Sequence, residues 1–149
     1  MSENQLARGM SIRSAAPTDL GAIKGLYAQL APDVSNVDTD FPAILSDPNA
    51  GCWILENEGE LIGMVICYVR PTLSSGNMMT VEELVIDQRH RRRGLGSILV
   101  KYCVDYAKAR KLDCVEVACS LVKTELHEFY ERVGFKHRMR LYSLFLAQE

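Results

Sequence analysis

The amino-acid sequence predicts an α/β (α+β) fold in which a mixed β-sheet carries helices on both faces. Segments with the apolar pattern of strands alternate with segments that repeat apolar residues every three or four positions, as amphipathic helices do. The early strands are joined by a short polar turn, so part of the sheet is antiparallel. Residues 81–102 combine a strand, a glycine turn and a helix, and this stretch dominates the functional prediction.

The composition indicates one domain and excludes several classes of protein. A chain of 149 residues can bury a substantial core. A net charge of −2 and a pI of about 5.9 argue against a general nucleic-acid binder. Five cysteines without a C-x-x-C pair indicate free thiols in a reducing cytosol, and no spacing suits zinc. No apolar run is long enough for a membrane span, and the first ten residues lack the apolar stretch of a signal peptide.

We therefore expect a cytoplasmic protein with no metal, no nucleic-acid partner and no membrane association. Residues 1–10 are expected to form a flexible leader, and residues 11–149 the single domain.

The first half of the chain is expected to supply four strands and two helices. Pro17 and Asp19 suit the first turn of a helix whose apolar face continues to Leu30, and Pro32 ends it. Residues 33–40 read as a polar loop before a short helix at 41–46. The strands are predicted at residues 11–15, 52–56, 61–70 and 78–86, with a turn at 57–60 and a loop at 71–77. Both faces of the third strand are apolar, which is typical of a central strand.

The second half is expected to hold two helices and two strands. The first helix has one apolar face, made by Leu95, Ile98, Leu99, Tyr102, Cys103 and Tyr106. A second helix is predicted at residues 124–132, with Gly134 just past its end as a C-cap. Strands are predicted at residues 114–119 and 138–147.

The turn before the helix at Leu95 has the composition of an anion site. The first turn of a helix leaves N–H groups without intrahelical partners, and the helix dipole adds positive charge there. Gly94 and Gly96 carry no side chain that would keep a ligand away, and Arg91, Arg92 and Arg93 surround the same place with guanidinium groups. A pyrophosphate fits this site better than other common ligands.

Other interpretations of the turn are a solvated basic loop or a nucleic-acid patch. The turn is not a Walker loop, because no Gly-Lys-Ser/Thr follows. It is not a dinucleotide fingerprint either, because Leu99 stands where the third glycine would be.

Two segments resemble the GNAT N-acetyltransferase superfamily. Arg91-x-x-Gly94-x-Gly96 is similar to the Q/R-x-x-G-x-G/A signature of its acetyl-CoA pyrophosphate loop, and residues 127–135 resemble its F-Y-E-x-x-G-F segment. Ile12-Arg13 with residues 17–20 resembles the common opening of the family. The resemblance implies a single GNAT-like domain with a central mixed, mostly antiparallel twisted sheet of six to seven strands.

The resemblance also implies which residues bind acetyl-CoA, the cosubstrate. The backbone of Leu84, Val85 and Ile86 would contact it, with the Leu84 N–H polarising the thioester carbonyl and Ile86 bonding the pantetheine amides. The pyrophosphate would be held by Arg91, Arg92, Arg93, Gly94, Leu95, Gly96 and Ser97.

A carboxylate is needed to take a proton from the acceptor amine, whose pKa is about 10.4 for a lysine-like group. Glu82 and Glu83 lie in an otherwise apolar strand. Alternation places Glu82 on the face of Leu84 and Ile86, and Glu83 on the face of Val81 and Val85. Related enzymes often place the base two or four residues before the position of Leu84, so we favour Glu82 over Glu83. The structural alternative is a carboxylate paired with Arg70 or Arg140.

Tyr130 matches the family tyrosine that gives a proton to the departing CoA thiolate; the alternative is a core tyrosine with a satisfied hydroxyl. His127 lies one helical turn before Tyr130 and would either cap the helix or orient a neighbouring group. Cys119 reads as a buried thiol. The stretch before residue 127 has no Asn, although the family often has one there. Lys123 is instead a candidate for binding the adenosine 3′-phosphate of CoA.

These residues predict an acetyl-CoA-dependent N-acetyltransferase. A small, cationic primary amine would attack directly in a ternary complex, and the last strand would pair across a homodimer. The alternatives are a catalytically silent acyl-CoA-binding module and an acetyltransferase of protein N-termini or lysine side chains.

Overall fold

The computed structural model describes residues 6–30, 36–119 and 121–146, in two compact units, Met1–Val117 and Ala118–Glu149. The strands all belong to the first unit and are β1 (Met10–Ser14), β2 (Ala50–Asn57), β3 (Glu60–Thr72), β4 (Gly76–Ile86) and β5 (Cys114–Val117). Its helices are α1 (Leu20–Ala28), α2 (Val37–Ser46) and α3 (Leu95–Ala109), with 3₁₀ turns η1 (Pro17–Asp19) and η2 (Gln88–His90). The second unit contains α4 (Thr124–Val133).

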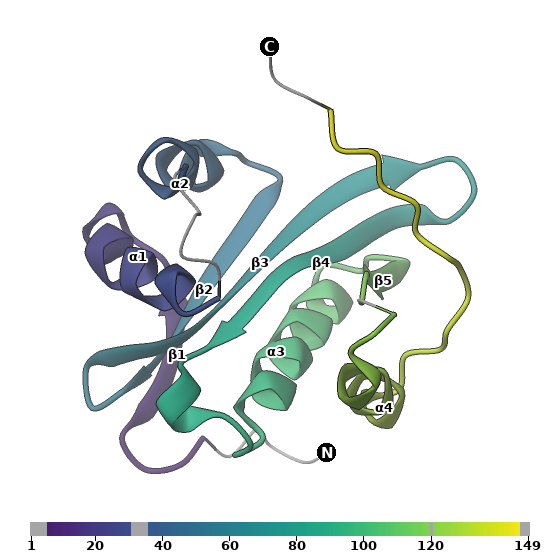
Figure 1. Ribbon diagram of the computed structural model, residues 1–149. Coiled ribbons are helices and arrows are strands. Elements are labelled where there is room, and N and C mark those ends of the chain that lie inside the picture. The colour runs from purple at the N-terminus through teal and green to yellow at the C-terminus, as the bar shows by residue number, and fades with distance from the viewer. Residues whose placement is uncertain (1–5, 31–35, 120, 147–149) are drawn as a thin grey trace. The chain divides into compact units, whose positions relative to one another are not determined.

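The five strands form one sheet in the order β1-β2-β3-β4-β5 (Figure 1). The first four pair with antiparallel neighbours and β5 lies parallel to β4, so the predicted mixed, mostly antiparallel sheet is confirmed. A parallel neighbour requires a crossover, which α3 supplies between β4 and β5.

The predicted number of strands is wrong, because the described chain has five rather than six or seven. Residues 138–146 were expected to form a last strand but have no regular structure, and Ala147 lies outside the described residues. Their apolar side chains are exposed, from 73% at Leu141 to 93% at Phe145. A strand needs a neighbour for its N–H and C=O groups, and none of the described residues pairs with this segment.

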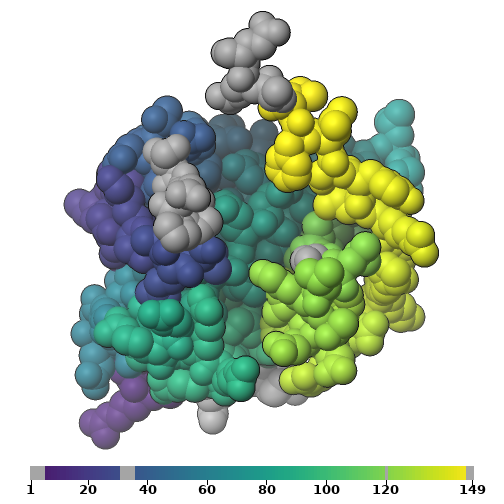
Figure 2. Space-filling model, in the orientation of Figure 1, coloured from purple at the N-terminus to yellow at the C-terminus, as the bar shows by residue number. Residues whose placement is uncertain are grey.

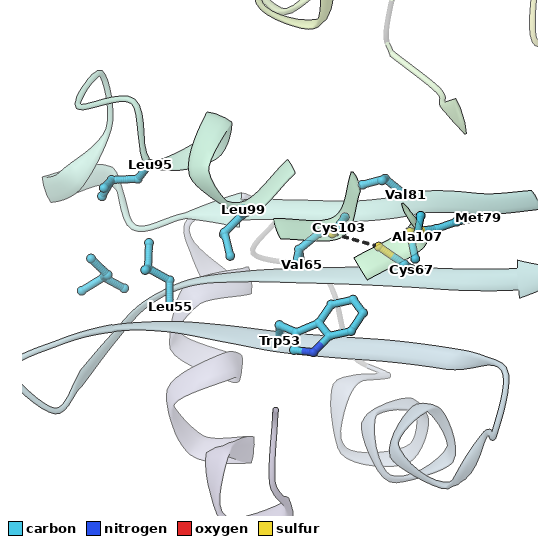
Figure 3. Packing of buried hydrophobic residues seen from close by; sticks show 11 residues of the cluster. Trp53, Leu55, Val65, Cys67, Met79, Val81, Leu95, Leu99, Cys103 and Ala107 are labelled. Carbon is cyan, nitrogen blue, oxygen red and sulfur yellow. Dashed lines mark hydrogen bonds between the residues drawn. The ribbon is translucent and has the colours of Figure 1, made fainter. Parts of the chain in front are cut away.

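Helices cover both faces of the sheet, as predicted: α1 and α2 lie on one face and α3 on the other (Figure 1). The core under α3 packs Trp53, Leu55 and Val65 of the sheet against Leu99 and Cys103 (Figure 3). The core under α1 and α2 is smaller. It contains Ile23, Leu26, Phe41, Ile54, Met64, Ile66 and Val85. Residues of β3 contribute to both cores, which confirms that β3 is a central strand.

The turn between β2 and β3 forms as predicted, with Glu58 at φ +50° and Gly59 at φ +83°. Positive φ at both central residues is typical of the type I′ turn that matches strand twist. The β3–β4 connection is shorter than predicted, because residues expected in a loop at 71–77 extend both strands.

Both helices on the α1 side differ from their predicted bounds. The Pro17–Asp19 segment forms η1, and α1 ends at Ala28; Pro32, the predicted stop, lies outside the described residues. Helix α2 begins at Val37 rather than at residue 41. Asp38 and Asp40 lie in its first turn, where the helix dipole stabilises carboxylates, so this part of the predicted loop is helical.

In the described part of the chain, every helix is too short or too polar to cross a bilayer.

Candidate active site

The edge of β4 that faces β5 is only partly paired. Strand β5 is in register with residues 78–81 of β4 and ends at Val117, whereas β4 continues to Ile86. Among the described residues no other strand joins this edge, so residues 82–86 have a backbone edge without a strand partner. Leu84, Val85 and Ile86, the predicted cofactor-binding backbone, lie in this stretch.

The other edge of β4 contains a β-bulge at Glu82. Ile66 of β3 is opposite Glu83 and Cys67 is opposite Val81, which leaves Glu82 without a partner on β3. The extra residue breaks the alternation of side chains. Val81 packs in the core under α3, as do Leu84 and Ile86. The prediction that Glu83 shares a face with Val81 is therefore wrong, although it does share one with Val85.

The two candidate bases have different surroundings. Glu82 is exposed at the bulge, whereas Glu83 is half-buried on the face that α1 and α2 cover. Arg70, one suggested structural partner, instead binds Glu116 at 2.9 Å. Glu116 also accepts a hydrogen bond from Thr80 Oγ1 at 3.1 Å.

Glu83 lies near Tyr27 of α1. The Tyr27 hydroxyl is buried and is the one buried side-chain polar atom, among the described residues, without a hydrogen-bond partner. Burial raises its pKa, and so do the charge of the nearby Glu83 carboxylate and a hydrogen-bonding interaction with it, although no hydrogen bond of ordinary geometry joins the two. Burial, with Asp19 and Glu83 nearby, raises the pKa of the Cys52 thiol to about 12. A buried hydroxyl without a partner costs about 1–3 kcal/mol, so Tyr27 needs an explanation.

The loop after β4 is built on Asp87, which is buried. Its carboxylate accepts hydrogen bonds from the Arg89 backbone N–H at 2.9 Å and from the Arg89 side chain at 3.2 Å. These bonds outweigh desolvation and lower the pKa of Asp87 to about 2. Gln29, at the end of α1, donates to Asp87 at 3.3 Å and accepts from the Gln88 N–H at 2.9 Å. Figure 2 shows the end of α1 against this loop.

The three predicted phosphate-binding arginines are all exposed. Arg91 Nε donates to the Ile86 carbonyl at 3.0 Å, which ties the loop to the end of β4. Arg93 Nη1 lies 2.8 Å from His90 Nδ1. Arg92 has a φ of +62°, which few non-glycine residues adopt and which is often found where a backbone holds a ligand.

Gly94 is the N-cap of α3 and has a φ of +73°, so its place favours glycine. No side chain caps this helix, and the Gly94 carbonyl accepts from the Ile98 N–H at 3.3 Å. The N–H groups of the preceding first-turn residues, Leu95, Gly96 and Ser97, therefore remain available. The Leu95 side chain is buried, so only its backbone is offered to a ligand.

These donors fit an anionic phosphate group. Free backbone N–H groups, the positive end of a 15-residue helix and three exposed guanidinium groups lie at one place. Among the described residues, no three His, Cys, Asp or Glu side chains come together as metal ligands would.

The second unit contains Tyr130 on α4. Its ring lies 4.9 Å from that of Phe129 and 5.7 Å from that of Phe135, with edge-to-face geometry. Burial, and secondly Cys119, raises the pKa of Tyr130 to about 12. Gly134 ends the helix at φ +115°, which confirms the predicted C-cap. His127 is half-buried on the same helix, and burial raises the pKa of Cys119.

Sequence reasoning missed Gln29 and Asp87, and it gave Tyr27 no functional role. The Asp-x-Arg order at residues 87–89 is a local signal for an aspartate that accepts from a backbone N–H two residues later. No local sequence pattern connects Gln29 with Asp87 and Gln88, which lie 58 and 59 positions later in the chain.

Similar proteins share both the sequence pattern and the fold. Aminoalkylphosphonate N-acetyltransferase from Salmonella typhimurium is 26% identical over 129 residues, which cover 84% of each chain. N-acetylaspartate synthetase from Xenopus tropicalis is 22% identical over 75% of this chain, which spans only 39% of that protein.

Two solved structures have the same fold. A transcriptional regulator from Bacillus halodurans superposes with a TM-score of 0.84 at 23% identity, covering 92% of this chain and 99% of that one. The aminoglycoside N-acetyltransferase AAC(6′)-Iy in complex with CoA has a TM-score of 0.79 at 20% identity, covering 96% and 98%. A sequence model of the acetyltransferase (GNAT) family matches residues 21–135. The chain therefore belongs to the acetyltransferase (GNAT) family and is an N-acetyltransferase by class.

Proposed function

We propose that the chain transfers an acetyl group from acetyl-CoA to a primary amine of a small molecule, with both substrates bound together. One observation carries the proposal: the uncapped N-terminus of α3 and three exposed arginines follow directly on the unpaired edge of β4. Phosphate groups bind to such helix ends. The CoA complex of AAC(6′)-Iy and the amine substrates in the relatives' names support this choice.

Residues 11–149 act as one N-acetyltransferase domain in this proposal. The family match runs from residue 21 to residue 135 and so includes parts of both compact units. The five cysteines are free, which is compatible with a reducing cytoplasm; Cys67 Sγ donates a hydrogen bond to Cys103 Sγ at 3.3 Å, and no disulfide joins them (Figure 3).

Acetyl-CoA would supply the acetyl group as a thioester. The backbone of residues 84–86 would contact its pantetheine arm, and the Leu84 N–H would donate to the carbonyl oxygen on which charge develops. Arg91, Arg92 and Arg93, with the backbone of residues 94–97, would hold the pyrophosphate. Glu82, exposed at the bulge, would accept the proton that the acceptor ammonium must lose.

Tyr130 would give a proton to the departing thiolate. With a pKa of about 12 its hydroxyl stays protonated at neutral pH and can act as a donor. We expect Tyr130→Phe to lower turnover at least tenfold, a common size for the loss of a general acid, while acetyl-CoA binding is kept. Tyr102→Phe is the matched control, because that half-buried tyrosine packs on Trp53 in the core under α3. Equal turnover in the two variants would contradict the role.

The function is tested by assaying a panel of primary amines with acetyl-CoA while free thiol is measured. In parallel, the melting temperature is recorded with CoA and with an oligonucleotide, and CoA should raise it. Arg93→Gln should weaken CoA binding roughly three- to tenfold, the effect of losing one charged hydrogen bond. Arg110→Gln, one residue past the opposite end of α3, is the control.

The other outcomes separate the alternatives. Stabilisation by CoA without thiol release on any amine would favour a silent acyl-CoA-binding module. Thiol release only with peptides would favour a protein acetyltransferase. No response to CoA would overturn the proposal.

We further propose that the protein is a homodimer joined through residues 139–146. This segment carries six exposed large apolar side chains, Met139, Leu141, Tyr142, Leu144, Phe145 and Leu146. A monomer rarely leaves so many apolar groups in one exposed stretch.

A further inference from the structure

Glu83 is one of two half-buried carboxylates that no ion pair includes among the described residues; the other, Asp47, accepts a hydrogen bond from the Asn49 N–H at 2.8 Å. Asp19 and Glu56 bind Arg13, and Asp87 and Glu116 each bind an arginine. Among the described residues no ion pair includes Glu83, although it is half-buried. The segments outside those ranges, residues 1–5, 31–35, 120 and 147–149, contain no lysine or arginine. A half-buried carboxylate without an ion pair is less well solvated than an exposed one, so this position favours a cation supplied from outside the chain.

The neighbours of Glu83 suit an organic cation. Tyr68 of β3 and Tyr27 of α1 both pack against the core on this side of the sheet, as does Cys52, which lies opposite Ile66. The Tyr27 hydroxyl makes no hydrogen bond of ordinary geometry within the described chain, and the Glu83 carboxylate is near enough to raise its pKa by charge and by hydrogen bonding. Lys24, the cation of α1, is bound to Asp38 at 2.9 Å. Aromatic rings beside a carboxylate are the surroundings in which ammonium groups bind.

An ion pair with Glu83 would favour the charged form of an amine. That is the wrong effect for the reacting nitrogen, which must lose its proton before it attacks. It is the right effect for a second ammonium group on the same acceptor, which anchors the molecule and stays charged.

We propose that Glu83, Tyr27 and Tyr68 bind a non-reacting ammonium group of the acceptor, so that the preferred substrates are diamines. Glu83 would form the ion pair, Tyr27 would offer its hydroxyl, and both rings would supply aromatic surface for the cation. This inference rests on the proposed acetyl transfer and adds the class of acceptor to it. Glu82 at the neighbouring bulge remains the proton acceptor for the reacting amine.

The kinetic test compares 1,4-diaminobutane with 1-aminobutane as acceptors. We expect the diamine to have at least a tenfold higher kcat/KM. Glu83→Gln should remove this preference by raising KM for the diamine at least tenfold, with KM for the monoamine and the affinity for acetyl-CoA unchanged within twofold. Asp105→Asn is the control, because Asp105 is an exposed carboxylate on α3. It should change KM for neither acceptor.

Tyr27→Phe provides a second variant that does not depend on removing a charge. It should raise KM for the diamine severalfold and leave the melting temperature the same or higher, because it removes a buried hydroxyl that has no partner. A lower melting temperature with an unchanged KM would mean that Tyr27 is structural and would overturn its part in the site.

Calorimetry separates this proposal from the proposed function. Binding of 1,4-diaminobutane to the protein with CoA should be at least tenfold tighter than that of 1-aminobutane, and Glu83→Gln should abolish the difference. This result would stand even if no amine released thiol. Equal binding of the two amines, or an equal fall in kcat for both acceptors in Glu83→Gln, would overturn the diamine site, the second outcome by making Glu83 the base.

Discussion

Asp87 gives the loop after β4 its shape, since one buried carboxylate binds both the backbone and the side chain of Arg89. Those bonds lower its pKa from 3.8 to about 2, so the folded protein holds the charged form more tightly than the unfolded chain does. A lowered carboxyl pKa contributes stability above the unfolded value, and this contribution is lost as the pH falls through the folded value.

We therefore expect the free energy of unfolding to fall by on the order of 2 kcal/mol through this group as the pH drops from about 4 to about 2. Asp87→Asn should be less stable at pH 6 and should lose this part of the slope. Urea unfolding between pH 2 and pH 6 measures both effects. Asp105→Asn should keep the full slope, and an Asp87→Asn curve parallel to the original would contradict the assignment.

Individual side chains were predicted well where local spacing decides their place. Gly134 has the positive φ of the predicted C-cap, and Gly94 lies in the predicted turn before the helix at Leu95. The prediction that Val81 and Glu83 share a face was wrong, because the bulge at Glu82 shifts the register by one residue and reverses every face on one side of it. A bulge depends on how β4 meets β3, and the sequence of β4 alone does not encode it.

At the scale of elements, the strand–turn–helix stretch was the most predictable part. Its pattern is local: β4 ends at Ile86 and α3 starts at Leu95, close to where alternation ends and helical spacing begins. The segment at residues 138–146 was the least predictable, because apolar content suggests a strand but only a neighbouring strand can satisfy its backbone. The start of α2 was also predicted wrongly, because its aspartates were read as part of a polar loop. In the first turn of a helix such aspartates are stabilising.

Two elements far apart in sequence meet at Gln29. Its amide joins the end of α1 to Asp87 and to the Gln88 N–H, and so supports the loop that leads to the arginines. We expect Gln29→Ala to weaken CoA binding roughly fivefold, because the loop would no longer be held in its bound shape and ordering it would cost about 1 kcal/mol. Calorimetry with CoA measures this change.

A second variant at Gln29 shows whether the residue positions the loop for CoA or only stabilises the fold. Gln29→Glu keeps an acceptor for the Gln88 N–H but replaces the donor to Asp87 with a second carboxylate. It should weaken CoA binding more than Gln29→Ala does, since two carboxylates repel. A fall in melting temperature with unchanged CoA affinity in both variants would show that the residue only stabilises the fold.

For the whole molecule, the mixed sheet and the helices on both faces followed from the order of the elements. A hairpin makes neighbours antiparallel, and a helix between two strands allows them to run parallel. The number of strands did not follow, since it depends on which apolar segments find a partner within the chain. Residues 138–146 lack one among the described strands, which connects the error in the fold prediction with the proposed dimer.

The proposed dimer has a direct test in residues 139–146. If two copies bury these side chains against each other, a change to charged residues should disrupt the dimer, because a charge buried in an apolar interface is not compensated. We expect the protein to sediment as a dimer and Leu144→Lys with Phe145→Lys to sediment as a folded monomer. Leu73→Lys, a fully exposed leucine in the β3–β4 turn, is the control and should stay dimeric. A monomeric original protein, or a double variant that still forms dimers, would mean that these apolar side chains do not hold two copies together.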